Sequence, residues 1–543
     1  MFEWVFICGI LFAFYNAWGI GANDCANSFA TSVGSGVLTL RKAILIAAIF
    51  EFSGAVFMGS HVTDMVRKNI VQTDVFEDNP GALMFGMLCA DLSSAIWLTT
   101  ATYFKLPVST THSIIGAIVG FSLAYDGHNS VNWDKIGLVV VSWVASPLLA
   151  GIFSSITFYS INRFIFKKDD PFNKIAMLFP FITFITFFIN VLFIIYKGSP
   201  QLNLEDMPFW QCFLISFGVS LFTAIISKVF YVPYAIRKIK QIEDNIEMNN
   251  TTVNQVEHNE NSENSENSEN SDNLNRIEIN ELNRSQSYLE SNNHIIIENN
   301  SKDLDIDTKI DENIDSEVDD NFTYDKSQTI KNNILRLRKY TKDIKKRQKD
   351  KEIEEFHNNA DKLDKDSEKL CDWIQIITAC FSSFAHGSND VANAIAPLAT
   401  IYHIYRYNTI SDTTDVPIWI LLIGGIGIVI GLATWGYRII DRIGREITKI
   451  SSSRGFIIEL SAALTVVIAS RIEMPVSTTH CQIGSVVGCG LVGGHKNIKW
   501  GLLKNIVMSW IITLPFTGLL SAGLFSYGYY SPNEYTTINI TST

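Results

Sequence analysis

The feature that most constrains this chain is a pair of polar inserts, each of which occurs twice within long hydrophobic stretches. The first insert is Gly-Ala-Asn-Asp-Cys-Ala-Asn-Ser at 21–28, and Gly-Ser-Asn-Asp-Val-Ala-Asn-Ala at 387–394 resembles it. The second is Pro-Val-Ser-Thr-Thr-His at 107–112, repeated without change at 475–480. The offsets of 366 and 368 residues indicate an internal duplication. Polar residues are costly inside a bilayer and mark ion or substrate pathways, so the pattern predicts a transport site between the two halves.

The composition indicates an apolar membrane part with one polar insert. The 543 residues combine 12% aromatic with 18% charged residues, and the mean hydropathy is positive. Residues 241–330 hold 23 acidic and 5 basic residues, whereas the whole chain has a net charge of −12, so the membrane part is mildly basic. That balance suits an anionic substrate, and the ordinary excess of Lys and Arg in cytoplasmic loops explains it equally. We expect no enzymatic activity, because no nucleophile–base constellation or nucleotide loop is evident, and no nucleic-acid partner.

The apolar runs predict an all-α membrane protein with about twelve transmembrane helices, because roughly 17 to 25 apolar residues cross a bilayer. The expected spans are 3–30, 43–60, 81–104, 108–125, 136–160, 175–196, 209–232, 372–400, 417–440, 456–472, 476–494 and 502–528. The two spans that follow the Pro-Val-Ser-Thr-Thr-His inserts are the weakest and are candidates for broken or re-entrant helices. Seven spans separate the two Asn-Asp inserts, so the halves enter the membrane from opposite sides. This predicts two inverted repeats of five spans each.

The same pattern divides the chain into segments. We expect an N-terminal transport repeat at 1–160, two linking transmembrane helices at 161–240, and a C-terminal inverted repeat at 371–530. Between them, 241–370 is expected to be a cytoplasmic loop, largely disordered because its Asn/Glu-rich stretches bury little apolar surface, with a charged helical end. The Lys and Arg residues of the short loops place both termini outside, including the tail at 531–543.

The Asn-Asp inserts carry the residue types that bind a hard cation. An Asn-Asp pair within an apolar span offers several oxygen ligands and one negative charge, which suits sodium. Asp24 and Asp390 are the expected metal ligands, for sodium only. The asparagines that supply amide oxygens or donate to an anion are Asn23, Asn27, Asn389 and Asn393. Positions 23, 24 and 27 suit one face of a helix. The alternative is that these side chains hold helices together by hydrogen bonds.

The Pro-Val-Ser-Thr-Thr inserts indicate a break followed by a new helix start. Proline ends the preceding helix, and Ser or Thr caps the next one. A helix that begins inside the membrane presents free N–H groups and the positive end of its dipole, which together bind anions. The hydroxyls that add donors are those of Ser109, Thr110, Thr111, Ser477, Thr478 and Thr479. Two such starts predict a neutral cage for a tetrahedral oxyanion, and local capping without a ligand is the alternative.

Further ionisable residues lie in the apolar spans. Glu51, Asp91 and Glu459 either bind or relay cations or pair with intramembrane donors, and we favour cation coupling for Glu51 and Glu459. Asp91 and Glu459 are partners in the duplication, whereas Glu51 has no acidic counterpart. We expect His112 and His480 to be hydrogen-bonded at the helix starts, with proton shuttling as the alternative.

At these residues the chain resembles the PiT family of sodium- or proton-coupled inorganic phosphate transporters. The family signatures are similar to Gly21–Gly36 and Pro107–His112, with second copies at Gly387–Thr400 and Pro475–His480. The resemblance covers about 1–240 and 370–530. It implies a twelve-span inverted repeat with two discontinuous hairpins, phosphate held by the Ser-Thr-Thr starts and cations on the Asn-Asp helices.

The resemblance also implies a function. Because eukaryotic members that resemble this chain are mostly sodium-driven, we expect sodium-coupled phosphate symport across the plasma membrane by alternating access. Sodium is the expected coupling ion, with no other cofactor. The expected partners are inorganic phosphate, sodium and the lipid bilayer, with a homodimer as a further candidate. Asn27 and Asn393 join the hydroxyls as phosphate ligands, and the sodium ligands are Asn23, Asp24, Asn389, Asp390, Glu51 and Glu459. The alternative is a proton-coupled phosphate or sulfate permease of the same fold.

Overall fold

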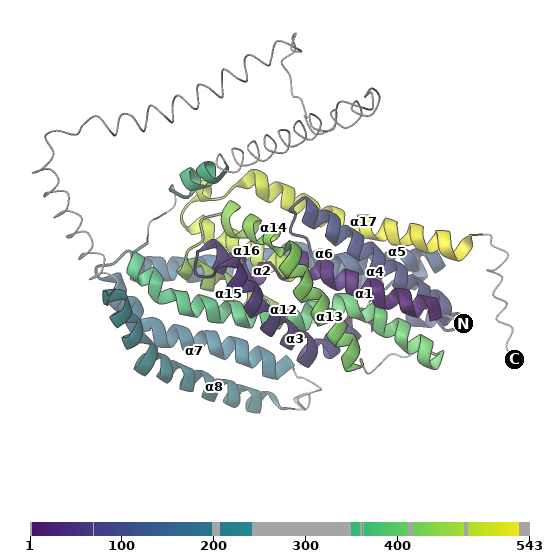
Figure 1. The fold of residues 1–543 in the computed structure, drawn as a ribbon, viewed down its shortest axis with the longest axis horizontal. Helices are drawn as coiled ribbons and strands as arrows, with labels where there is room; N and C mark the ends of the chain where they lie inside the picture. Colours follow the sequence, from purple (N-terminus) through teal and green to yellow (C-terminus); the bar gives the residue numbers. More distant parts are fainter. Residues whose placement is uncertain are drawn as a thin grey trace, which may run out of the picture. The chain divides into compact units, whose positions relative to one another are not determined.

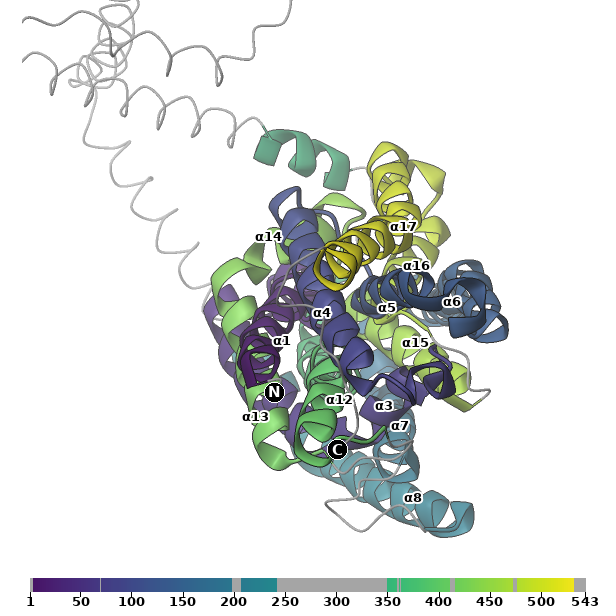
Figure 2. The same ribbon diagram turned by 90° about the vertical axis from the view of Figure 1, so that its right-hand side faces the viewer.

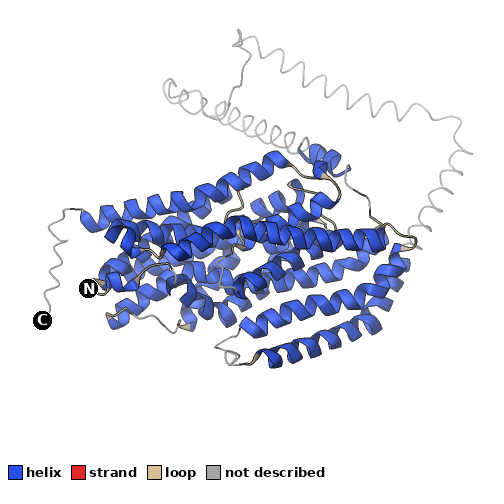
Figure 3. Cartoon of the chain, turned by 180° about the vertical axis from the view of Figure 1, so that it is seen from behind, coloured by secondary structure: helices blue, strands red, loops and turns tan. Residues whose placement is uncertain are grey.

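A computed structural model describes residues 3–68, 70–197, 207–241, 349–358, 361, 363–410, 416–471 and 476–531. Every regular element in these ranges is a helix (Figure 3), and one isolated antiparallel bridge joins Val71 to Val131. The chain divides into two units, Met1–Ile236 with Glu352–Thr543, and Arg237–Lys351. The helix bundle lies in the first unit. The predicted all-α class is confirmed for the described residues, whereas residues 242–330 of the loop predicted to be disordered and residues 532–543 of the tail lie outside them.

The helices of the bundle follow the chain in two series joined by α7 and α8 (Figures 1 and 2). The first series is α1 (Glu3–Asn23), α2 (Asn27–Gly34), α3 (Leu40–Lys68), α4 (Pro80–Tyr103), α5 (Thr110–Asp126) and α6 (Trp133–Ile161). The joining helices are α7 (Pro171–Lys197) and α8 (Phe209–Ile226). The second series is α12 (Lys365–Tyr407), α13 (Ile418–Gly431), α14 (Tyr437–Asp441), α15 (Ser452–Arg471), α16 (Thr478–Val492) and α17 (Trp500–Tyr530).

Short helical segments extend or connect these elements. Three are 3₁₀ helices, at Thr73–Phe76, Gly127–Ser130 and His495–Asn497. Four are single π-helical turns, at Asn162–Phe166, Ser227–Tyr231, Leu432–Gly436 and Arg442–Glu446. These π turns continue α6, α8, α13 and α14, so the helical rods are longer than the α-helical bounds alone.

Eight helical stretches of the described chain are long and apolar enough to cross a membrane. They are Glu3–Gly34, Leu40–Gly59, Pro80–Tyr103, Trp133–Phe166, Pro171–Tyr196, Phe209–Gln241, Ile418–Glu446 and Trp500–Tyr530. Each coincides with one of the twelve predicted spans. The other four predicted spans fall on α5, α12, α15 and α16, which are shorter or carry more polar residues.

Helix starts follow the expected capping chemistry. Asn79 caps α4, accepting a hydrogen bond from the backbone N–H of Ala82 at 3.2 Å, and Pro80 occupies the first turn, where no N–H is needed. Asp364 caps α12 by accepting from the backbone N–H of Ser367 at 2.9 Å. The predicted starts after the Pro-Val inserts are confirmed, because α5 begins at Thr110 and α16 at Thr478. Pro475 itself lies outside the described residues.

Glycines allow two equivalent backbone contacts between helices of the two series. A Cβ at Gly120 of α5 would lie 2.0 Å from the carbonyl oxygen of Gly518 in α17. A Cβ at the equivalent Gly488 of α16, 368 residues later, would lie 2.2 Å from the carbonyl oxygen of Gly151 in α6. Only a residue without a side chain allows such close crossings. The two helix starts are therefore held by the same kind of contact, each against a long helix from the opposite end of the sequence.

A second close crossing joins α3 to α12. A Cβ at Gly54 would lie 2.1 Å from the carbonyl oxygen of Phe384, and one at Gly387 would lie 2.1 Å from that of Glu51. This backbone contact places Glu51 directly beside the turn of α12 that carries the second Asn-Asp insert. The helices α7 and α8 pack together along one side of the bundle, as Figures 1 and 2 show.

Candidate functional site

The first Asn-Asp insert interrupts the helix that the sequence predicts across it. Residues 24–26 form a turn between α1 and α2, so Asn23 and Asn27 do not share a helical face. The prediction of one face was wrong for this copy, whereas the second copy lies within the continuous α12. The turn brings the Asp24 side chain into contact with groups from both halves of the chain.

Asp24 is the centre of a hydrogen-bond network that joins the halves. Its Oδ2 accepts from the Thr110 hydroxyl at 2.8 Å, and its Oδ1 accepts from the Thr479 hydroxyl and from the Asn27 amide. Asn27 also donates to Thr479 at 2.8 Å. Asp24 is 1% exposed. Both helix starts therefore donate a hydroxyl hydrogen bond to the same buried carboxylate.

Asn23 has a different environment from the rest of its insert. Its Nδ2 donates to the Thr102 hydroxyl and to the carbonyl oxygen of Leu106, both at 2.9 Å. Its Oδ1 accepts from the backbone N–H of Val108 at 3.0 Å. These bonds fix the non-helical segment between α4 and α5, so they orient the first helix start.

The second Asn-Asp insert also makes hydrogen bonds to the opposite half of the chain. Asn393 donates to the hydroxyls of Thr110 and Thr111 and to Asp390 Oδ1, each at 3.1 Å. Asp390 Oδ2 accepts from the Thr478 hydroxyl at 3.2 Å. Asn27 thus contacts the helix start of α16, and Asn393 contacts the helix start of α5. Asn389 is half-buried and lines the pocket described below.

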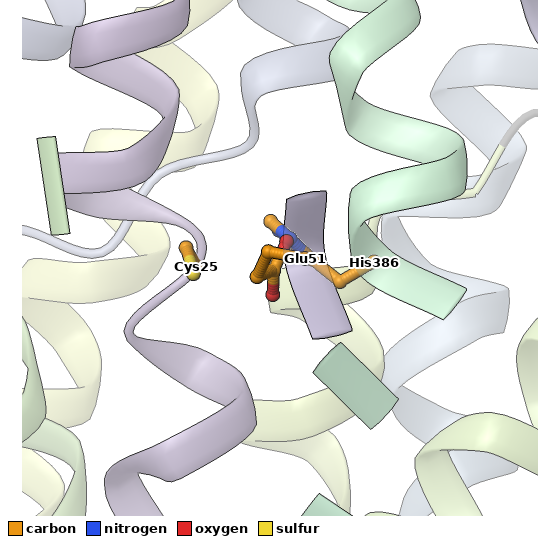
Figure 4. Close-up of side chains that lie close together, drawn as sticks. All are labelled: Cys25, Glu51 and His386. Atoms are coloured by element: carbon orange, nitrogen blue, oxygen red, sulfur yellow. The ribbon is translucent and has the colours of Figure 1, made fainter. Parts of the chain in front are cut away.

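A histidine that the sequence argument did not single out joins three carboxylates. His386 Nδ1 lies 2.9 Å from Glu51 Oε2, and its Nε2 lies 2.8 Å from Asp390 Oδ2 and 4.0 Å from Asp24 Oδ1. Figure 4 shows Glu51 and His386 with Cys25 beside them. In the sequence, His386 could have been found from its position one helical turn before Asp390. The duplication did not indicate it, because the equivalent residue of the first half is Ile20.

Two overlapping groups of side chains have the geometry to hold a metal ion. In one, ligand atoms of Asp24, His386 and Asp390 all lie within 4.8 Å of one another, and Cys25, Glu51 and His386 form the other. Carboxylate oxygens are ligands for hard cations such as sodium, whereas a thiol favours softer metals. The donor set around Asp24 and Asp390 therefore fits sodium better than the set that includes Cys25.

Glu459 lies in a separate buried cluster. Its carboxylate accepts hydrogen bonds from the hydroxyls of Thr31 in α2 and Thr378 in α12. One carboxylate with two hydroxyl oxygens is again an oxygen-rich set. Its repeat partner Asp91 accepts instead from the amide of Asn16 at 2.9 Å, so the two acidic partners have different surroundings.

The first serine of each helix start acts as a cap. Ser109 accepts from the backbone N–H of His112 at 3.2 Å, and Ser477 accepts from that of His480 at 3.3 Å. The expected hydrogen bonds of the two imidazoles are absent among the described residues. Instead the rings lie against each other with centroids 4.9 Å apart, and His480 stacks on Trp510 at 3.9 Å. Packing between the halves replaces the polar contact that the sequence suggested.

A small pocket opens beside these groups. Its polar lining includes Asn27, His386, Asn389, Thr478 and Gln482. Asn190 of α7 also lines it, so the joining helices contribute to the wall. The buried carboxylates, the hydroxyls of the helix starts and this pocket form one continuous polar region at the junction of the two helix series.

A helical bundle with membrane-crossing helices and a buried polar site between its halves defines a membrane transport protein. Comparison with known proteins identifies the family of the chain. Residues 20–521 match the Phosphate transporter family, and the chain therefore belongs to that family. This confirms the resemblance seen in the duplicated motifs.

Curated relatives match over nearly their whole length. The chain is 32% identical to sodium-dependent phosphate transporter 1 of Mus musculus, over 96% of this chain and 95% of the mouse protein. It is also 32% identical to sodium-dependent phosphate transporter 2 of Xenopus tropicalis, over 96% and 97% of the two chains. A solved structure described as the sodium-dependent phosphate transporter matches with a TM-score of 0.67 and 29% identity, covering 97% of this chain and 100% of that one.

Proposed function

We propose that the protein is a sodium-coupled inorganic phosphate symporter that imports phosphate across the plasma membrane. The observation that carries this proposal is the buried Asp24 carboxylate, which accepts hydroxyl hydrogen bonds from Thr110 and Thr479. A buried negative charge needs a compensating cation, and the hydroxyls beside it are donors suited to an oxyanion. Membership of the Phosphate transporter family and the sodium-dependent names of its relatives agree with both ligands.

Each predicted ligand keeps its role in this proposal. Phosphate is held by Ser109, Thr110, Thr111, Ser477, Thr478, Thr479, Asn27 and Asn393. Sodium is held by Asn23, Asp24, Asn389, Asp390, Glu51 and Glu459. The contacts between Asp24 and Asp390 on one side and the helix-start hydroxyls on the other support this division, whereas Glu459 with Thr31 and Thr378 forms a sodium site of its own. The side-chain oxygen of Asn23 also accepts from the backbone N–H of Val108, so in this proposal Asn23 orients the helix start as well as contributing to sodium binding.

The same contacts suggest why the two ligands bind together. In the structure, the hydroxyls of Thr110 and Thr479 donate to Asp24. A sodium ion bound to the Asp24 carboxylate compensates its negative charge. The two hydroxyl groups are then free to donate to phosphate. The ion also reduces the repulsion between Asp24 and the anion. Sodium therefore raises the affinity for phosphate, and by linkage phosphate raises the affinity for sodium.

We further propose the twelve-span architecture with two inverted five-span repeats, in which one repeat rocks against the other around the site. The equivalent glycine contacts of α5 with α17 and of α16 with α6 support it. Both termini are then outside and the large loop is cytoplasmic. A homodimer is the remaining candidate partner.

Uptake of radiolabelled phosphate into vesicles containing the full chain tests the function. Sodium and pH are varied independently, and sulfate is added as a competitor. We expect saturable uptake that requires sodium at constant pH and is weakly inhibited by sulfate. Uptake driven by a proton gradient without sodium, or equal inhibition by sulfate, would instead establish the proton-coupled phosphate or sulfate permease of the same fold.

A further inference from the structure

The pocket beside the start of α16 has an electrically neutral lining apart from one histidine. The described residues that line it include no Asp, Glu, Lys or Arg, and its polar groups are amides, hydroxyls and the His386 imidazole. Neutral donors and acceptors distinguish ligands by the hydrogen bonds that the ligand itself can make. An oxyanion in this pocket is therefore selected by its own donors and acceptors as well as by its charge.

Asn27 lines this pocket and has a buried acceptor without a partner among the described residues. Its Nδ2 donates to Asp24 and to Thr479. Since a carboxylate oxygen only accepts, the amide nitrogen must face Asp24, and Oδ1 points away from it. This Oδ1 is buried and has no hydrogen-bond partner among the described residues. The residue is 3% exposed, so bulk water does not supply the missing donor.

Gln482 lines the same pocket and carries a buried donor. It lies on α16 one helical turn after Thr478, so both side chains are on one face. Its Nε2 is buried and lacks a partner in the part of the chain that the structure describes, and the residue is 3% exposed. The equivalent residue of the first half is Ile114, which belongs to an apolar cluster. The duplicated motifs therefore give no structural reason for an amide here.

Unpaired polar atoms at full burial are rare in folded proteins, and a group of them in one pocket indicates a ligand that completes their hydrogen bonds. We propose that Asn27 and Gln482 select a protonated tetrahedral oxyanion. Gln482 Nε2 donates to an unprotonated oxygen of hydrogenphosphate, while Asn27 Oδ1 accepts the hydrogen of the P–OH group. This inference rests on the proposed phosphate transport and adds the basis of its specificity.

The chemistry distinguishes phosphate from sulfate. Inorganic phosphate keeps at least one P–OH group at neutral pH, whereas sulfate is fully ionised and has only acceptors. With sulfate bound, Asn27 Oδ1 faces an acceptor and stays unpaired. A site built to bond a substrate hydroxyl rejects an analogue that lacks it, because the buried protein group is left without its partner.

The first test uses the unaltered chain in vesicles at neutral pH and fixed sodium, with labelled phosphate and three competitors. Arsenate keeps an As–OH group, whereas monofluorophosphate and sulfate have no hydroxyl. We expect arsenate to compete within about threefold of phosphate, and the other two to need at least about tenfold higher concentrations. Monofluorophosphate that competes as well as arsenate, with phosphate uptake intact, would overturn the inference. No sodium-dependent phosphate uptake at all would instead count against the proposed function.

The second test replaces the donor. Gln482→Met keeps the length of the side chain and removes its amide, and Gln375→Met is the matched control. Gln375 is also buried, but it lies outside the pocket lining and accepts from the Ser35 hydroxyl at 3.0 Å. We expect Gln482→Met to raise the half-saturating phosphate concentration about tenfold at normal surface level, with the phosphate-to-sulfate ratio unchanged because either anion accepts from Gln482. Equal phosphate affinity in the two variants would overturn the role of Gln482.

Discussion

The polar side chains of the site differ in whether they bond within one half of the chain or across both. Thr479 and Asn393 cross: the first donates to Asp24 of the opposite half, and the second to Thr110. Among the described residues, Asn23 bonds to Thr102 and to backbone groups of its own half. In the proposed rocking motion, crossing bonds break when the halves move apart, and we expect them to couple ligand binding to conformation. Bonds within one half persist and preserve the local shape.

Neutralising the central carboxylates tests the sodium assignment. Asp24→Asn and Asp390→Asn keep the shape of the side chain but remove the charge that balances a cation. We expect each to raise the sodium concentration for half-maximal uptake at least tenfold, which is about 1.4 kcal/mol. Asp372→Asn is the control, since that half-buried carboxylate accepts from the Ser452 hydroxyl outside the proposed site. Wild-type sodium activation in both test variants would show that sodium binds elsewhere.

We expect substitutions of the threonine and of the serine hydroxyls at the helix starts to have different effects on phosphate affinity and stability. Thr110→Val and Thr478→Val remove donors that face buried carboxylates, so we expect a higher half-saturating phosphate concentration, by about tenfold, at normal surface level. A hydrogen bond to a charged group contributes about 1.5–3 kcal/mol.

Ser109→Ala and Ser477→Ala remove caps as well as donors, which costs about 1 kcal/mol of helix stability. We expect these two variants to show lower thermal stability and lower surface level in addition to weaker phosphate binding. Kinetics normalised to surface level separate the two effects. Unchanged phosphate affinity in all four variants would remove the hydroxyls from the phosphate site.

At the residue scale, duplication was the main source of what the sequence could predict. The duplicated Asp24 and Asp390 both lie beside His386. Glu51 contacts the same histidine without having a counterpart, whereas the duplicated Asp91 and Glu459 lie in different surroundings. His386 and Gln482 were missed because their counterparts are Ile20 and Ile114, so no repetition marked them. Their burial beside unpaired or charged groups depends on helix packing, which a single sequence does not contain.

At the scale of elements, the predicted helices were recovered and one interruption was not. The two Asn-Asp inserts have nearly the same sequence, yet the first forms a turn at 24–26 and the second continues α12. Neither contains Gly or Pro within the Asn-Asp-x-x-Asn pattern. The turn is therefore fixed by tertiary partners, among them Thr479 and Thr110, and local propensity could not reveal it.

The helix crossings give a prediction of their own. A Cβ at Gly488 would lie 2.2 Å from the carbonyl oxygen of Gly151, so Gly488→Ala forces α16 away from α6. We expect a loss of about 1–3 kcal/mol of stability, measured as a lower Tm of the purified protein. Gly137→Ala is the control, because a Cβ there meets nothing within 4 Å and alanine favours a helix. Equal Tm values for the two variants would contradict the tight crossing.

At the scale of the whole molecule, charge is divided unequally between the segments. Residues 241–330 carry 23 acidic and 5 basic residues, so they hold more than the entire net charge of −12. The ligands proposed for phosphate and sodium all lie in the two halves that flank this segment. We therefore expect transport to depend on the duplicated helices, with the acidic segment adding a charge that salt screens beyond about 10 Å.

Removing the acidic segment tests that division. Deleting 245–330 leaves every residue of the proposed site in place, and we expect the half-saturating phosphate concentration to stay within about threefold, roughly 0.7 kcal/mol. If its charge acts on the site at a distance, the deletion should change phosphate affinity more at low salt than at high salt, because screening weakens only long-range interactions. Measuring uptake at both ionic strengths, normalised to surface level, distinguishes the two cases. Loss of uptake at normal surface level, at either ionic strength, would show that the loop takes part in transport.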